Sequence, residues 1–252
     1  MKNPWLKFCF FIVVFFSSFS VFAQSTSTEK LASWKENVTL AGQQYQLTVN
    51  VFQQTKDSEI VDLWSEWLID SANGQEKLNC EPSSMLQVSE IKASPDGRFL
   101  AIISVGEGHP ILDIVDLAAL ITRQQCKTIW TINPYPSYIT IEKWSGNKLI
   151  VSSGNLLTHK IDEQYPIEFF DSEKFSLDLQ TQTIEGVSKN AKNPIPYFIN
   201  MLSDPENKLL AANILAQLKA QSAIPYLKKM LEKETNPDAQ DQLRNAINQL
   251  SH

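Results

Sequence analysis

The chain has 252 residues, of which 43% are apolar and 20% are charged, with 22 basic and 28 acidic side chains. A chain of this length and composition can bury a sizeable hydrophobic core, which excludes a disordered, collagenous or coiled-coil protein. The formal net charge of −6 excludes the broadly basic surface with which a nucleic-acid binder neutralises phosphates.

The N-terminus has the pattern of an export signal. Lys2 and Lys7 precede a short apolar stretch at residues 8–16, and Ala23 is a small residue at a signal-peptidase cleavage position. The alternative, a membrane anchor, needs about 20 apolar residues in a row, and serines interrupt this stretch earlier. We therefore expect residues 1–23 to be a signal peptide cleaved after Ala23. The mature protein is then periplasmic or extracellular and has no integral membrane segment.

Export changes the interpretation of the two cysteines that follow the signal. Cys80 and Cys126 are isolated, without a CxxC motif or histidines at metal-ligand spacing. In an oxidising compartment such a pair favours a disulfide over the alternative of two free buried thiols. The bond would stabilise the fold by roughly 4 kcal/mol if its effect is to restrict the unfolded chain.

Residues 38–187 have the pattern of β-strands. Apolar and polar side chains alternate over residues 44–52, which is typical of a strand with one buried face. A second strand is expected at residues 60–70, with its tryptophans on opposite faces. The Asn73-Gly74 pair predicts a tight hairpin after that strand.

A turn motif marks the next part of the β region. Ser94-Pro95-Asp96-Gly97 can join two strands tightly, because proline presets φ and glycine accepts the left-handed conformation. Further strands are expected at residues 111–117 and 126–132, and a degenerate copy of the motif lies within residues 141–151. Four strands in meander order describe one propeller blade, and a repeat of about 50 residues suits such a blade.

The Ser-Pro-Asp-Gly turn followed by a Leu-Ala-containing strand resembles the repeats of periplasmic and peptidase-type β-propellers. The resemblance covers residues 88–187 and implies a propeller-like antiparallel β domain over residues 24–190. This region holds at most about three blades, whereas propellers close with about four to eight. A function that depends on the channel of a closed ring is therefore not expected.

After residue 190 the pattern becomes helical and repeats once. Ile195-Pro196-Tyr197 is echoed by Ile224-Pro225-Tyr226, with proline in the first helical turn, where its missing N–H costs nothing. Asp204-Pro205-Glu206 and Asn236-Pro237-Asp238 are expected to start the second helix of each unit. Each triplet supplies a capping side chain, a proline and an acid for the positive end of the helix dipole.

This helical segment resembles the short HEAT-like repeats first recognised in phycobilin lyases, and the resemblance covers residues 194–250. The expected fold is therefore a two-part α+β protein, with a propeller-like antiparallel β-sheet domain followed by an α-helical HEAT-like repeat pair at residues 191–252. Two repeats are fewer than a solenoid needs to bury its faces. We expect the helices to pack on the β region or on a partner.

Residues for catalysis or metal binding are few. Glu107, His109 and Asp113 could supply metal ligands, but hairpin tips gather such residues for solvation. The acidic clusters 162–163 and 171–173 could mimic paired glycosidase carboxylates, although their loop setting favours solvated surface. We therefore expect no catalytic, cofactor-binding or metal-binding residues.

Two features predict protein-binding surfaces. Tyr135 and Tyr138 stand in a proline-framed loop at residues 133–138, an arrangement that costs little ordering entropy on binding. The alternative is that both tyrosines pack over the edge of a blade. The helical part carries a cluster of lysines, which would otherwise be a solvated helix face: Lys219, Lys228, Lys229 and Lys233.

The leading hypothesis is an exported, non-enzymatic interaction module that binds another protein, as an adaptor, assembly factor or binder of a secreted protein. The alternative is an exported hydrolase whose dispersed active site forms around His109 or His159.

Overall fold

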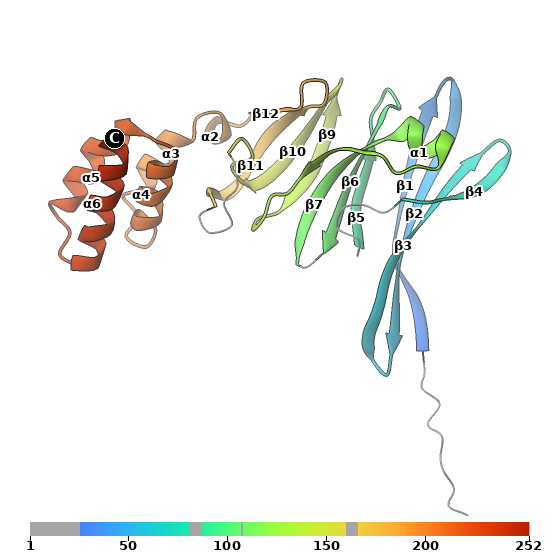
Figure 1. The fold of residues 1–252 in the computed structure, drawn as a ribbon, viewed down its shortest axis with the longest axis horizontal. Coiled ribbons are helices and arrows are strands. Elements are labelled where there is room, and N and C mark those ends of the chain that lie inside the picture. Colours follow the sequence, from blue (N-terminus) through green and yellow to red (C-terminus); the bar gives the residue numbers. More distant parts are fainter. Residues whose placement is uncertain (1–25, 81–86, 107, 160–165, 252) are drawn as a thin grey trace, which may run out of the picture.

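The computed structural model describes residues 26–80, 87–106, 108–159 and 166–251. The predicted signal peptide and the acidic pair 162–163 lie outside these residues. Figure 1 shows an elongated molecule in which three β-sheets stand in a row and a group of helices adjoins the third sheet.

Each sheet has four antiparallel strands in meander order. The first contains β1 (Thr26–Leu40), β2 (Gln43–Lys56), β3 (Glu59–Ser71) and β4 (Gly74–Leu78). The second contains β5 (Gln87–Ala93), β6 (Phe99–Gly106), β7 (His109–Asp116) and β8 (Thr128–Ile132). The third contains β9 (Ile139–Ser145), β10 (Lys148–Asn155), β11 (Glu168–Asp178) and β12 (Thr183–Gly186).

The first sheet is larger than the sequence pattern predicted, because β1 is a full strand. Its register runs along the whole of β2, from Thr26 opposite Lys56 to Leu40 opposite Gln43. The ends of β1, β2 and β3 continue past the body of the molecule as a ribbon (Figure 1). The two tryptophans of β3 do face opposite ways. Trp67 is buried, whereas Trp64 stacks on Phe52, with ring centroids 5.4 Å apart.

The first strands of successive sheets lie side by side and are joined through their side chains. The indole N–H of Trp34 in β1 donates to the carbonyl of Val88 in β5 at 3.3 Å. Glu36 accepts the N–H of Ala93 at 3.4 Å. Burial raises the pKa of Glu36, and this hydrogen bond and the charge of Lys92 oppose the rise.

The same type of contact recurs between the second and third sheets. Glu90 in β5 accepts the N–H of Ile141 in β9 at 3.1 Å, and the indole of Trp144 donates back to the carbonyl of Lys92 at 3.2 Å. Successive sheets are therefore connected by an acid and a tryptophan, each of which satisfies a backbone group of the neighbouring strand.

The predicted Ser-Pro-Asp-Gly turn joins β5 to β6 and also touches the first sheet. Gly97 has a φ of +69°, and a Cβ at this position would lie 2.1 Å from the carbonyl oxygen of Thr39. Only glycine satisfies both the left-handed backbone and this close approach.

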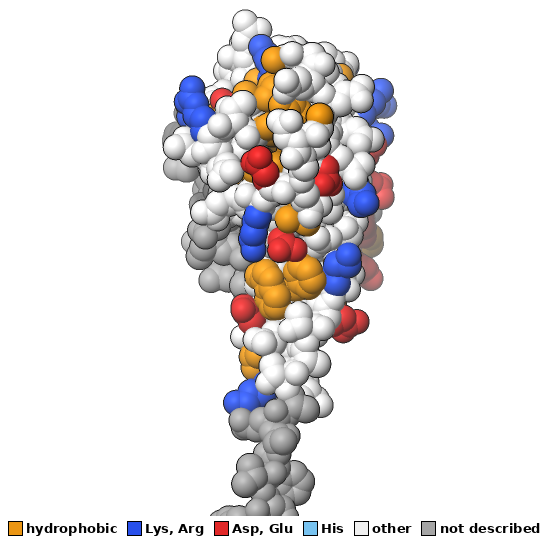
Figure 2. All heavy atoms as spheres, turned by 90° about the vertical axis from the view of Figure 1, so that its right-hand side faces the viewer, with side chains coloured by type: hydrophobic (Ala, Val, Ile, Leu, Met, Phe, Trp, Pro, Cys, Tyr) orange, Lys and Arg blue, Asp and Glu red, His pale blue; other side chains and the backbone are white. Residues whose placement is uncertain are grey.

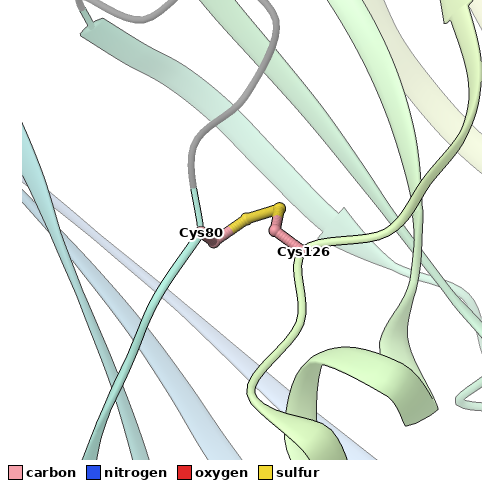
Figure 3. The surroundings of a disulfide bond; sticks show 2 residues. All are labelled: Cys80 and Cys126. Carbon is pink, nitrogen blue, oxygen red and sulfur yellow. A yellow bond between two sulfur atoms is a disulfide. The ribbon is translucent and has the colours of Figure 1, made fainter.

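The predicted disulfide between Cys80 and Cys126 is present, with Cα atoms 4.6 Å apart (Figure 3). Cys80 follows β4 and Cys126 precedes β8, so the bond connects the outer strands of the first and second sheets. The side of the sheets away from β1 and β5 is thereby held by a covalent link.

The helices are α1 (Leu117–Arg123), α2 (Lys189–Lys192), α3 (Pro194–Met201), α4 (Lys208–Gln217), α5 (Ile224–Leu231) and α6 (Pro237–Ser251), with a 3₁₀ turn at Gln221–Ala223. The sequence pattern did not predict α1, which Asp116 caps by accepting the N–H of Ala119 at 2.9 Å. None of the helices in the described ranges is both long and apolar enough to cross a membrane.

The second helix of the first pair begins later than predicted. Asp204-Pro205-Glu206 forms a turn, in which the Asp204 carboxylate accepts the N–H of Glu206 and the side-chain amide of Asn207. α4 therefore starts at Lys208. In the second pair the prediction holds, since Asn236 accepts the N–H groups of Asp238 and Ala239 and α6 begins at Pro237.

α2 to α6 share one hydrophobic core with the second and third sheets. Phe169 of β11 stacks on Phe198 of α3, with centroids 5.5 Å apart, and meets the ring of Tyr197 edge-on at 5.4 Å. The Tyr197 hydroxyl also accepts the N–H of Phe170 at 3.0 Å. The expected packing of the helices on the β region is thus observed, on the outer face of the third sheet.

No element among the described residues covers the outer face of the first sheet, at the opposite end of the row. Figure 2 shows this face, where small hydrophobic patches alternate with charged and other polar side chains. The molecule is a mixed α+β protein with antiparallel sheets followed by helices, as predicted. The sheets form a row that is not closed into a ring.

Candidate protein-binding site

The loop at residues 133–138, here called the tyrosine loop, crosses from β8 of the second sheet to β9 of the third. At the start of the loop, the Asn133 side chain accepts the N–H of Tyr135 at 2.9 Å. Ser137 then donates its N–H to the carbonyl of Pro134 at 3.0 Å. The loop is therefore built from two short turns, as its Asn, Pro and Ser content favours.

A buried asparagine beneath the loop holds its backbone. Asn155, at the end of β10, is 1% exposed, and its side-chain amide donates to the carbonyls of Pro134 and Tyr135. The amide nitrogen lies 2.9 Å from the Tyr135 oxygen. The backbone N–H of Asn155 donates to the hydroxyl of Ser153 at 3.1 Å. The loop is thus fixed to the third sheet by two hydrogen bonds from a buried side chain.

A glycine next to this asparagine makes room for the loop. A Cβ at Gly154 would lie 2.4 Å from the Ser137 hydroxyl and 3.4 Å from the Tyr138 ring. An alanine here would force the Ser137 hydroxyl out of its position. The loop and the strand therefore fit together through Asn155 and Gly154, neither of which the sequence pattern singled out.

The two tyrosine side chains nevertheless remain partly exposed to solvent. Tyr135 is 37% exposed and Tyr138 is 44% exposed. The loop backbone packs over a sheet edge, while part of each tyrosine side chain remains accessible. An anchored backbone that presents exposed tyrosines loses little entropy when these rings bind a partner.

The loop also borders a cavity of about 320 Å³ between the second and third sheets. Tyr135 and His159 both line it, and the ring of His109 meets Tyr135 edge-on, with centroids 5.0 Å apart. The structure thus places both histidines of the hydrolase alternative beside one tyrosine. Within the described ranges, no hydrogen bond joins either imidazole to a hydroxyl or a carboxylate.

Two carboxylates predicted to be solvated are buried instead. Glu173 is 5% exposed, and it accepts hydrogen bonds from the hydroxyl of Ser188 and, at 2.7 Å, from the amide of Asn190. Asp113 is fully buried in β7 and accepts the Thr131 hydroxyl at 2.6 Å. The prediction was wrong for these two because each lies in a strand rather than at a loop tip. Asp171 is exposed, as expected.

The lysines of the helical part lie on an open surface. Lys228 and Lys229 are exposed in the last turn of α5, and Lys219 and Lys233 follow α4 and α5. A groove of about 480 Å³ runs between α3 and α5, and Tyr226, which is 54% exposed, lies along it. α4 packs on both α3 and α6, and α5 packs on α6.

Metal-ligating side chains do not converge anywhere in the part of the chain that the structure describes, where no three His, Cys, Asp or Glu residues are placed to hold an ion. No family model matches the chain, and no curated protein matches it in sequence.

Proposed function

We propose that the protein is an exported, non-enzymatic interaction module that binds another protein through the tyrosine loop. Its role is that of an adaptor, an assembly factor or a binder of a secreted protein. The observation that carries this proposal is the contrast within residues 133–138. Asn155 and Gly154 fix the backbone, while Tyr135 and Tyr138 remain exposed.

Exposed tyrosines on a fixed backbone have the properties of protein-binding residues. Tyrosine is enriched in interfaces because one side chain offers both apolar area and a hydroxyl. A residue that served only to pack the loop would bury its ring. The two rings instead expose large apolar area at a position where the loop is already held by other residues.

The architecture gives secondary support. We propose that the three sheets are blades of an open propeller-like arc and that α3 to α6 form two HEAT-like repeats, since the residues that carry both resemblances lie in the corresponding turns and helices. Both types of repeat commonly serve as scaffolds for protein binding. This support comes from architecture alone and is weaker than that from the site.

Charge favours a second contact on the helices. Residues 189–252 carry eight basic and six acidic side chains, whereas residues 24–188 carry 12 basic and 22 acidic ones. The exposed Lys228 and Lys229 therefore offer a positive surface on an acidic protein. A partner that touches the helices would present acidic residues there, and binding would weaken as salt is raised.

Export is part of the proposal. The disulfide between Cys80 and Cys126 supports it, because structural disulfides persist in oxidising compartments and are rare in reducing ones. The predicted signal peptide at residues 1–23 would direct the chain to export.

A capture experiment tests the proposed function. The mature full chain is immobilised and incubated with an extract of exported proteins from the source organism, and retained proteins are identified by mass spectrometry. The proposal predicts a specific set of proteins that wild type retains and that Tyr138→Ser loses by at least tenfold.

Phe170→Ser is the matched control, because Phe170 is 60% exposed on β11 and lies outside the tyrosine loop. This variant should retain the same proteins as wild type. Equal retention by wild type and Tyr138→Ser, or equal losses in the two variants, would refute the assignment of binding to the loop.

A further inference from the structure

The cavity of about 320 Å³ beside the tyrosine loop is formed where the outer strands of two sheets meet. β8 and the residues after it form one wall, and β12 together with the residues after β10 forms the other. Gln182, before β12, donates its side-chain amide to the carbonyl of Ile129 in β8 at 3.0 Å. This hydrogen bond joins the two outer strands next to the cavity.

The Tyr135 wall of the cavity is held in place before any ligand arrives. Asn155 fixes the carbonyl of Tyr135, Asn133 accepts its N–H, and His109 contacts its ring edge-on. A wall fixed in this way does not have to be ordered on binding, which lowers the entropic cost of filling the cavity.

The lining selects for an uncharged ligand with an aromatic ring. The described residues of the lining are three rings, three aliphatic side chains and two uncharged polar side chains, with no lysine, arginine, aspartate or glutamate among them: Trp130, Tyr135, His159; Ile132, Leu157, Ile184; Thr131 and Asn133. A phosphate or carboxylate ligand would find no fixed countercharge here. Aromatic ligands gain from edge-on and offset contacts with such rings.

The volume of the cavity further limits which ligands fit. Cavities for small molecules span about 300–1,000 Å³, so this one lies at the lower end of the range and suits a single ring system. In protein interfaces, aromatic side chains that fill such pockets carry much of the binding energy.

We propose that this cavity receives one uncharged aromatic side chain, tyrosine or tryptophan, from the protein partner. The proposal rests on the proposed function and deepens it. Tyr135 then has two roles, since one part of its ring contacts the partner's surface and another part lines the pocket for the partner's anchoring residue.

The test uses the mature full chain and defined small probes, so it does not require the partner. Titration with N-acetyl-tyrosinamide and N-acetyl-tryptophanamide is followed through the indole N–H resonance of Trp130 in nuclear magnetic resonance spectra. Trp130→Phe assigns that resonance. We expect a saturable shift with both aromatic probes and at least tenfold weaker binding of N-acetyl-leucinamide, N-acetyl-aspartamide and glucose.

Ile184→Trp supplies the matched variant, because Ile184 is partly exposed at the cavity and a larger ring there fills the space. This variant should lose probe binding by at least tenfold, whereas Phe170→Ser should keep it. Spectra of the remaining residues confirm that each variant is folded.

The possible results separate the two proposals. No saturable shift with the aromatic probes, or glucose binding as tightly as they do, would overturn the cavity proposal. If Ile184→Trp still captures the proteins that Tyr138→Ser loses, the loop binds a partner and the cavity plays no part. If the probes bind but no protein is captured, the cavity binds aromatic rings, but the protein-binding function fails and the assignment of that ring to a protein partner fails with it.

Discussion

At the scale of single residues, a few small or amide side chains decide where the tyrosines lie. Alternation and turn composition predicted the loop and its strands, because those patterns are local. They did not predict that Gly154 and Asn155 hold the loop. Both residues lie inside a strand pattern, and the loop residues that they contact are about 20 positions earlier in the sequence. A glycine followed by an asparagine within an apolar strand is a weak signal of a close backbone approach, and it was available.

The fit between Gly154 and Ser137 predicts a specific double-mutant result. Gly154→Ala should destabilise the protein by roughly 1–3 kcal/mol, because the new Cβ would lie 2.4 Å from the Ser137 hydroxyl. Adding Ser137→Ala removes that hydroxyl and leaves the serine Cβ at 3.6 Å, an ordinary contact. Urea denaturation of wild type, both single variants and the double variant measures the coupling. Additive effects would show that the loop does not rest on Gly154.

Two turn glycines provide a second comparison between matched sites. Gly97 and Gly146 both have positive φ, of +69° and +62°, in the turns that start the second strand of successive sheets. Gly146→Ala meets no atom within 4 Å, so only the left-handed backbone is strained, at a cost of roughly 1–2 kcal/mol. Gly97→Ala also collides with the Thr39 carbonyl.

We therefore expect Gly97→Ala to cost roughly 1–3 kcal/mol more than Gly146→Ala in thermal or urea unfolding. Both variants strain the left-handed backbone, so the difference between their unfolding free energies measures the collision with the Thr39 carbonyl. Equal costs would contradict the contact between the Ser-Pro-Asp-Gly turn and the first sheet.

At the scale of elements, predictions succeeded where the periodicity was strong and failed where it was not. The strands from Gln43 to Gly186 and the paired helices were located because their apolar residues recur at two or 3.6 positions. β1 was missed because its N-terminal half is exposed and polar, so no apolar face marks it. α1 was missed because its seven residues lie between two strands and are too few for a helical period.

The disulfide is expected to contribute substantially, because it closes a long loop between two sheets. The double variant Cys80→Ser, Cys126→Ser should lower the free energy of unfolding by roughly 4 kcal/mol. Adding a reductant to wild type should produce a similar loss. Mass spectrometry of the unreduced mature protein checks the bond itself, and alkylation of both thiols without prior reduction would contradict it.

A pH-sensitive contact joins the two helical pairs. Lys208 donates to Glu234 at 2.5 Å and lowers the pKa of that carboxyl below its ordinary value, with help from the N–H groups of Asn236 and Thr235. A carboxyl whose pKa is lowered by folding stabilises the folded state above its unfolded pKa. This stabilisation is lost as pH falls through the folded value.

Glu234→Gln should therefore melt at a lower temperature than wild type near pH 7, and the difference should shrink as pH falls toward about 3. Circular dichroism melts at several pH values measure this. The exposed neighbour Glu232→Gln serves as the control and should show no such trend. A difference that stays constant with pH would rule out an ionic contribution from Glu234.

At the scale of the whole molecule, the two ends of the row are unlike. Helices cover the outer face of the third sheet through Phe169, Tyr197 and Phe198, whereas nothing in the described part of the chain covers the outer face of the first sheet. The sequence predicted that the helices need a surface to pack on, because two repeats expose more apolar area than they can bury alone. Which sheet they cover depends on long-range packing that no local pattern contains.

The whole molecule also brings together residues that the sequence left as separate features. Tyr135, His109 and His159 were considered for different roles and meet at one place between two sheets. The arrangement arises because the tyrosine loop crosses from the second sheet to the third. A protein-binding role for this place is the central claim of our account.

Site-specific photo-crosslinking tests that claim most directly. A photoreactive phenylalanine replaces Tyr138 in the full chain, in cells of the source organism, and an identical replacement of Phe170 serves as the comparison. Our account predicts a discrete crosslinked protein from position 138, lost when Asn155→Ala releases the loop, and none from position 170. Light-dependent adducts that are absent at 138, or that are the same at both positions, would contradict it.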